Sequence, residues 1–106
     1  MSVQKGFIAK ENVDEKQIEA WKQKYDDVLL VEIGDKEFYL KSPSRKVVSL
    51  AMSKGRDKPL MMIDVLFNNC LLGGDQYDRL DIGDVTGLAA KVDEIIGTRE
   101  AKVKKL

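Results

Sequence analysis

Residues 59–72, PLMMIDVLFNNCLL, form the most apolar stretch of this chain. Apolar residues recur there at the three- and four-residue spacing of one helical face: Leu60, Ile63, Phe67 and Cys70. Further apolar side chains widen that face or lie opposite it: Met62, Leu66, Val65 and Leu72. A helix that is apolar almost all round has to be enclosed by other elements. The sequence therefore predicts a buried central helix around which the rest of the chain packs.

Two short segments before this helix predict β-strands. Residues 28–33 (VLLVEI) and 37–41 (EFYLK) are rich in branched or aromatic side chains. Gly34 and Asp35 between them suit a tight turn whose first central residue takes a positive φ. A lone hairpin is marginal in water, so we expect it to lean on the helices or to gain a strand from a partner. Its free edge is a candidate docking site.

The N-terminal segment predicts an extended arm followed by a helix. Residues 1–11 contain few apolar anchors, Phe7 and Ile8 being the main ones. Asn12 and Glu15 have capping-box spacing, which predicts a helix start. The helix should present one apolar stripe: Ile18, Trp21 and Tyr25.

Another helix is predicted immediately before the central one. Ser42 and Pro43 suit its cap and first turn. Gly55 can take the left-handed conformation that ends a helix. Its core face is expected to contain Val47, Leu50 and Ala51.

Beyond the central helix, Gly73 and Gly74 are expected to stop it, and residues 75–81 to form an acidic loop. Asp84 is expected to cap a last helix. The apolar residues of that helix are Val85, Leu88, Val92 and Ile95. Residues 98–106 form a basic tail.

These elements predict one α+β domain over residues 1–106, in which the hairpin packs against about four helices. The residues expected in or near the core are Trp21, Leu30, Phe38, Leu50, Ile63, Leu66, Phe67, Leu88 and Val92.

Charge is balanced overall but unevenly distributed. The 18 basic and 18 acidic residues cancel, which leaves no net field to attract nucleic acid or an anionic membrane. Five cations lie between residues 44 and 58: Arg45, Lys46, Lys54, Arg56 and Lys58. Four aspartates lie in the following loop region: Asp75, Asp78, Asp81 and Asp84. This segregation suits docking or self-association, and two solvated edges of opposite charge would give the same pattern.

Catalysis is not expected from these residues. The chain contains no histidine, so Ser-His and Cys-His nucleophilic machinery is excluded within it. Cys70 lies on the apolar helix face and is expected to be a small core residue. The aspartate spacing does not match an EF-hand, and no glycine pattern matches a phosphate loop. No catalytic residue, metal site or cofactor is predicted.

Nucleic acid and membrane are not expected as partners. The helix pair joined by residues 55–58 has the order of a helix-turn-helix, whose second helix must present polar side chains to bases. Here that helix offers Met61, Met62, Val65 and Phe67 instead. The lone cysteine and the lack of a signal peptide or an uninterrupted apolar run of ~18 residues predict a cytoplasmic protein.

Residues 38–75, FYLKSPSRKVVSLAMSKGRDKPLMMIDVLFNNCLLGGD, resemble the small tail assembly chaperones of long-tailed bacteriophages and prophages in their order of parts. A strand is followed by the motif Pro-x-Arg-Lys and then by a helix. A second helix starts at a Lys-Pro pair and is followed by Gly-Gly-Asp. The residues that carry this likeness are Pro43, Arg45, Lys46, Ala51, Met52, Lys58, Pro59, Asn69, Cys70, Gly73, Gly74 and Asp75. The long basic tail departs from the family pattern.

The resemblance implies a protein without covalent chemistry that coats the tape measure protein and brings tail tube subunits to it. We expect partner binding through Arg45, Lys46, Met52, Lys54, Arg56, Lys58, Met61 and Met62. Methionines form adaptable apolar surfaces, although the alternative is that they fill the core. A small homo-oligomeric structural or regulatory protein of a phage or mobile element is the competing class. Members of the family are often made in two lengths through a ribosomal frameshift near the end of the short form. The codons of the paired Lys104 and Lys105 permit such a frameshift.

Overall fold

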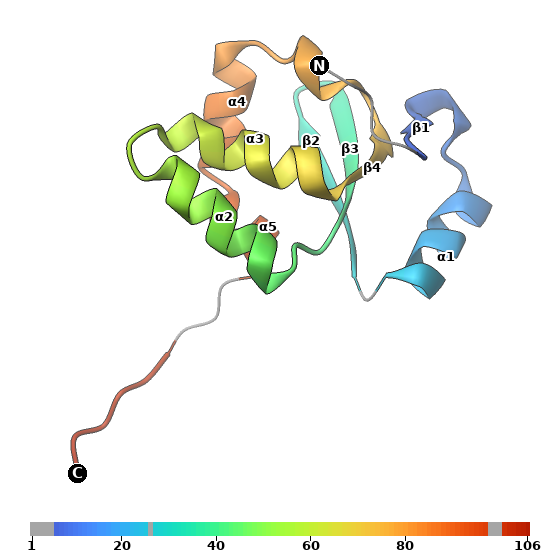
Figure 1. Cartoon of the computed structure of the whole chain (residues 1–106). Coiled ribbons are helices and arrows are strands. Elements are labelled where there is room, and N and C mark those ends of the chain that lie inside the picture. Colours follow the sequence, from blue (N-terminus) through green and yellow to red (C-terminus); the bar gives the residue numbers. More distant parts are fainter. Residues whose placement is uncertain (1–5, 26, 98–100) are drawn as a thin grey trace.

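The predicted hairpin forms one side of a larger sheet in the computed structural model, which describes residues 6–25, 27–97 and 101–106. Within those ranges, four strands form one mixed sheet in the order β1-β4-β3-β2 (Figure 1). They are β1 (Ile8–Ala9), β2 (Val28–Ile33), β3 (Lys36–Lys41) and β4 (Leu71–Gly74). The hairpin turn is confirmed, because β2 and β3 are antiparallel and Gly34 has a φ of 60°. The sheet thus gains its extra strands from this chain.

The α+β class is confirmed, with one helix more than expected among the described residues. The helices are α1 (Glu15–Lys24), α2 (Arg45–Gly55), α3 (Pro59–Cys70), α4 (Ile82–Ala89) and α5 (Val92–Ile96), with 3-10 turns η1 (Lys10–Asn12) and η2 (Tyr77–Arg79). The predicted last helix is divided into α4 and α5 because the backbone leaves helical geometry at Lys91, where φ is −109° and ψ is 12°. No helix in the described ranges is long and apolar enough to span a membrane.

The glycine pair after α3 forms a strand, so the prediction that it merely stops the helix was wrong. The helix ends at Cys70, and Leu71–Gly74 becomes β4, antiparallel to β3 and parallel to β1. A Cβ atom at Gly73 would lie 2.5 Å from the carbonyl oxygen of Ile8. A Cβ atom at Gly74, where φ is 114°, would lie 2.3 Å from the carbonyl oxygen of Glu37. Glycine is therefore required here by close backbone approach.

The N-terminal arm contributes to the sheet and does not only lie on the body. Ile8 and Ala9 pair with Gly73 and Gly74, while residues 1–5 of the predicted arm lie outside the described residues. The predicted Asn12 cap was also wrong, because Asn12 belongs to η1. Asp14 caps α1 instead, and its Oδ1 accepts a 2.9 Å hydrogen bond from the Gln17 N–H.

Two other predicted caps are displaced along the chain. Ser44, not Ser42, caps α2, with its Oγ accepting from the Val47 N–H at 3.2 Å. Asp81, not Asp84, caps α4, and its Oδ1 accepts from the Asp84 N–H at 2.8 Å. In each case a neighbouring residue of the same capping type occupies the boundary.

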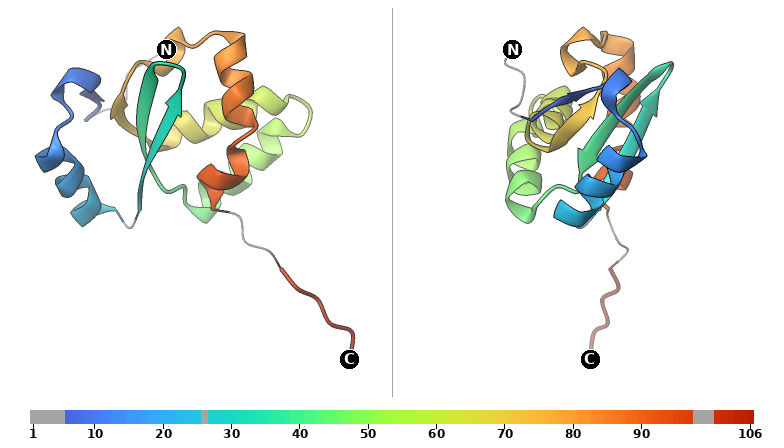
Figure 2. Two further views of the ribbon diagram at one scale, coloured as in Figure 1. Left: turned by 180° about the vertical axis from the view of Figure 1, so that it is seen from behind. Right: turned by 90° about the vertical axis from the view of Figure 1, so that its right-hand side faces the viewer.

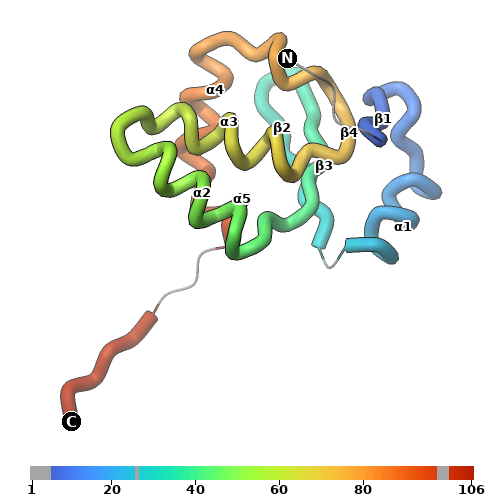
Figure 3. The backbone as a smooth tube through the Cα atoms, in the orientation of Figure 1, coloured from blue at the N-terminus to red at the C-terminus, as the bar shows by residue number. Residues whose placement is uncertain are grey.

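Gly55 does not end α2 in the left-handed conformation, so that prediction was wrong. It is the last helical residue and is buried against α3, the next helix in the hairpin-like pair shown in Figure 3. A Cβ atom there would lie 2.9 Å from the Met62 Cβ. The lack of a side chain lets α2 and α3 approach closely. Pro59 begins α3 as predicted.

The core is centred on α3, which confirms the predicted buried helix. Ile63, Leu66, Phe67 and Cys70 are each no more than 1% exposed. The Phe67 ring stacks on Tyr77 at 4.6 Å and meets Phe38 edge to face at 5.4 Å. On the opposite face of the sheet, the Trp21 ring of α1 lies 5.6 Å from the Tyr39 ring.

Leu30 and Leu50 are wrong as core predictions, since they are 50% and 44% exposed. On β2, alternate residues such as Leu29 and Val31 face the core, which turns Leu30 to the other side of the sheet. The remaining predicted core residues are buried, or in the case of Val92 half-buried against the core.

Candidate partner-docking surface

The outward side of α2 exposes cationic and apolar side chains together. Its inward side is made of Val47, Ala51 and Gly55, which are four residues apart and pack toward α3. The opposite residues line a shallow hollow of about 690 Å³: Arg45, Lys46, Ser49, Leu50 and Ser53. We call this set the α2 surface. Met52 lies beside it and is 54% exposed.

The cations of the α2 surface are not placed for helix stability. Arg45 and Lys46 occupy the first turn of α2, which contains no acidic residue. The N-terminus of a helix carries a partial positive charge, so two cations there are unfavourable, typically by about 0.3 to 1 kcal/mol each when exposed. None of the ion pairs found within the described ranges includes either residue. Their charges are therefore not neutralised by an ion pair with any described residue.

The structure separates the predicted cations into two groups. Arg45 and Lys46 lie at the start of α2, whereas Lys54, Arg56 and Lys58 lie at its end and in the following turn. All of them are exposed. An eleven-residue helix is ~16 Å long, so both groups can contact one elongated partner that follows α2.

The predicted methionines differ in accessibility. Met52 is exposed, Met61 is half-buried, and Met62 is half-buried against the core and against Gly55. Leu50 was missed as a surface residue, because an apolar side chain beside Ala51 was assigned to the core. The small residues Ala51 and Gly55, four apart, were the signal that could have identified the inward face.

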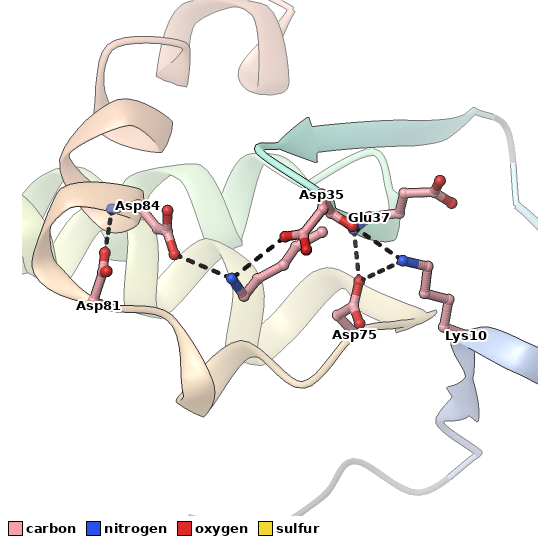
Figure 4. A network of polar contacts seen from close by, with 7 residues as sticks. Lys10, Asp35, Glu37, Asp75, Asp81 and Asp84 are labelled. Carbon is pink, nitrogen blue, oxygen red and sulfur yellow. Dashed lines mark hydrogen bonds and ion pairs between the residues drawn. The ribbon is translucent and has the colours of Figure 1, made fainter.

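Two of the aspartates after β4, Asp75 and Asp84, interact with residues of the β2–β3 hairpin, and Asp75 also interacts with Lys10 (Figure 4). The Asp75 Oδ2 accepts a 2.8 Å hydrogen bond from the Glu37 N–H and lies 3.3 Å from the Lys10 Nζ. The hydrogen bond from Glu37 and the nearby Lys10 ammonium lower the pKa of Asp75. The Asp84 Oδ2 lies 3.6 Å from the Lys36 Nζ. In the described part of the chain, no group of three or more His, Cys, Asp or Glu residues could hold a metal ion.

The buried titratable groups have structural explanations. Burial raises the pKa of the Cys70 thiol, which is 1% exposed and is therefore a poor nucleophile at neutral pH. The Tyr77 hydroxyl donates a 2.6 Å hydrogen bond to the Asp64 Oδ1. Burial first, and then the Asp64 carboxylate, raise the pKa of Tyr77, so that its hydroxyl stays protonated. Both side chains stabilise the core.

A second surface lies along β2, the edge strand of the sheet. A groove of about 440 Å³ runs between this strand and α5. It is lined by Val28, Leu29, Leu30, Val31, Glu32, Lys91, Glu94 and Ile95.

Comparison of the chain with models of protein families, with curated proteins and with solved structures finds no match in any of the three. Function is therefore inferred from these two surfaces and from the sequence pattern.

Proposed function

We propose that this protein is a non-enzymatic tail assembly chaperone of a long-tailed bacteriophage or prophage, which binds the tape measure protein and tail tube subunits in the host cytoplasm. The order of the strand, the two helices and the short motifs over residues 38–75 supports assignment to this family of chaperones. The observation that carries the proposal is the placement of Leu50 beside Arg45 and Lys46 in one hollow of the α2 surface.

The α2 surface suits a helical partner with apolar and acidic side chains. Such a helix docks by inserting apolar anchors into a groove, and Leu50 and Met52 offer the exposed apolar area for that contact. Removing an apolar side chain from water contributes roughly 25 cal/mol per Å². Arg45 and Lys46 add charge complementarity, which speeds encounter and selects the partner.

Binding to a partner protein and binding to nucleic acid differ in their response to salt. Nucleic-acid binding is tight at low salt and falls steeply as salt rises, because it depends on released counterions. Binding through Leu50 and Met52 persists near physiological salt, since apolar contact is not screened. Retention of duplex DNA by the purified protein near physiological salt would contradict the proposal.

Capture of the partner tests the proposal directly. The protein is co-expressed with the product of the long helical reading frame that the proposal predicts downstream of its gene, and the complex is recovered near physiological salt. We expect the Arg45→Glu/Lys46→Glu variant to lose at least tenfold in affinity, and Leu50→Ala to lose severalfold. Lys16→Glu/Lys22→Glu is the matched control, because both of its lysines are exposed on α1. Equal capture of the wild type and the α2 variants would overturn the role of the α2 surface.

The nucleotide sequence supplies an independent test. An adenine run at the Lys104 and Lys105 codons, an overlapping frame and a long helical frame downstream would support the family. If all three are missing, a small homo-oligomeric structural or regulatory protein becomes the better proposal. The exposed edge of β2, where Leu30 is 50% exposed, is the observation that favours that alternative.

A further inference from the structure

Among the described residues, the outer edge of β2 has no strand beside it, and its backbone groups there form a regular row without a hydrogen-bond partner. In an antiparallel pair, alternate residues direct their N–H and C=O groups to the partner strand and away from it. Val31 and Leu29 face Phe38 and Leu40 in register, and the Ser42 N–H donates to the Asp27 carbonyl oxygen at 3.1 Å in the same series. Val28, Leu30 and Glu32 therefore direct their backbone groups away from β3.

The surroundings of this edge form a groove and not a flat surface. One side of it is formed by Glu94 and Ile95 of α5 and by Lys91, which immediately precedes that helix. Ile95 is buried, whereas Lys91 and Glu94 are exposed. A strand between a sheet edge and a helix is a recurring mode of peptide recognition, in which the backbone supplies hydrogen bonds and alternate side chains fill the groove. The β2 groove has both components.

The charge of this edge is acidic where the strand approaches the hairpin turn. Glu32 lies opposite Glu37 in the β2–β3 register, and like charges directly opposite each other are unfavourable. Glu94 adds another carboxylate on the α5 side, where it pairs with Lys91 at 3.5 Å. An incoming strand with lysines would relieve the repulsion between Glu32 and Glu37.

The segment 101–106, AKVKKL, has the composition that this groove requires. It is exposed, has no regular secondary structure and extends away from the body in both views of Figure 2. Val103 and Leu106 are 95% and 115% exposed, so large apolar side chains are without a contact there. In a strand, Ala101 and Val103 share one face, and Lys102 and Lys104 share the other.

We propose that residues 101–106 of one copy of this protein add as a fifth strand to the β2 edge of a second copy. Ala101 and Val103 face Ile95 of the acceptor, while the stems of Lys102 and Lys104 cover Leu30 and their ammonium groups reach Glu32. The segment of six residues is long enough to span the five edge residues 28–32 that line the groove.

A second copy is the proposed occupant because residues 101–106 extend away from the body of their own chain in Figure 1, and their lysines complement the charge of Glu32 in the groove. Donor and acceptor are different surfaces of the chain, so the contact is heterologous and each added copy leaves another free groove. The proposal predicts oligomers whose size rises with concentration. It does not involve Arg45, Lys46 or Leu50, so its failure would leave the proposed function standing.

Paramagnetic broadening between copies identifies the occupant. A nitroxide is attached to Lys105→Cys in the full chain; Cys70 is 1% exposed and should not react in the folded protein. This chain is mixed with unmodified chain labelled with ¹⁵N. We expect broadening of the amides of residues 28–32 and 91–95 in the labelled copy, removed by ascorbate. Broadening only when nitroxide and ¹⁵N are in the same molecule would assign the groove to its own tail, and would overturn the proposal. Broadening elsewhere, or none, would also overturn it.

Charge exchange tests the pairing by a separate readout. Sedimentation velocity over a concentration series should show that Glu32→Lys weakens self-association several-fold, and that Lys102→Glu/Lys104→Glu does the same. Combining all three substitutions should restore association. Glu19→Lys, an exposed position on α1, is the matched control and should leave association unchanged. The proposal fails if Glu32→Lys behaves as Glu19→Lys does, or if the combined variant is no better than the single changes.

Discussion

The helices α2 and α3 are neighbours of similar length, 11 and 12 residues, but they use their apolar side chains in opposite ways. In α3 the large side chains Ile63, Leu66 and Phe67 are buried. In α2 the buried positions are Ala51 and Gly55, while Leu50 and Met52 are exposed. The difference shows that close approach of two helices requires small residues at the contact, so that the larger apolar residues of α2 lie on its exposed side.

The largest expected effect comes from truncating matched apolar residues in the two helices. Phe67→Ala should lower the free energy of unfolding by about 3 to 5 kcal/mol, because it leaves a cavity between Phe38 and Tyr77. Leu50→Ala should change it by no more than about 0.5 kcal/mol, since that side chain is 44% exposed. Urea unfolding of both variants measures the difference. Similar losses in the two helices would refute the assignment of buried and exposed sides.

An intermediate effect is expected at the contact between the helices. Gly55→Ala places a Cβ atom 2.9 Å from the Met62 Cβ, so α2 and α3 must move apart. Overpacking typically costs about 1 to 3 kcal/mol, and the gain in helix propensity offsets at most about 1 kcal/mol. We expect a net loss of about 1 kcal/mol in thermal or urea unfolding.

Gly83→Ala is the control for that substitution. Gly83 is also helical, but a Cβ atom added there would have the Asp81 Oδ1 as its nearest neighbour at 3.4 Å, an ordinary contact. It should stabilise the protein by up to about 0.5 kcal/mol through helix propensity. If Gly55→Ala is stabilising to the same degree, the two helices do not depend on close approach at that residue.

The smallest effect concerns Asp75, which joins the hairpin to the N-terminal arm. Because the pKa of Asp75 is lowered in the folded state, its carboxylate stabilises the protein above its ordinary pKa of about 3.9. This contribution is lost as the pH falls from that value through the lower pKa of the folded state. Asp75→Asn should cost about 0.5 kcal/mol at pH 7, since the pair with Lys10 is partly exposed. The cost should vanish in acid, and a cost independent of pH would contradict the role of the charge.

Some elements could be predicted from the sequence because their signals are local. The central helix followed from apolar residues at helical spacing, and the hairpin followed from two strand-like segments around Gly34 and Asp35. The caps at Ser44 and Asp81 were each missed by two or three residues. Several residues that favour the N-cap position stand close together there, so residue type alone does not select among them.

The remaining elements depend on contacts between distant segments. Nothing in Leu71–Gly74 marks it as a strand, because its glycines are useful only when β1 and β3 lie beside them. The cations of the candidate site could be predicted from the sequence because they cluster between residues 44 and 58. Leu50 could not be placed beside them without knowing that Ala51 and Gly55 form the inward side of α2.

Amide hydrogen exchange with and without the proposed helical partner tests the central claim, which is that α2 presents a docking surface and α3 the core. Binding should slow exchange in α2, residues 45–55, while α3 amides, already protected by burial, should change little. The Arg45→Glu/Lys46→Glu variant should show no such slowing at the same partner concentration. Slowed exchange elsewhere with α2 unchanged, or equal slowing in the variant, would contradict the claim.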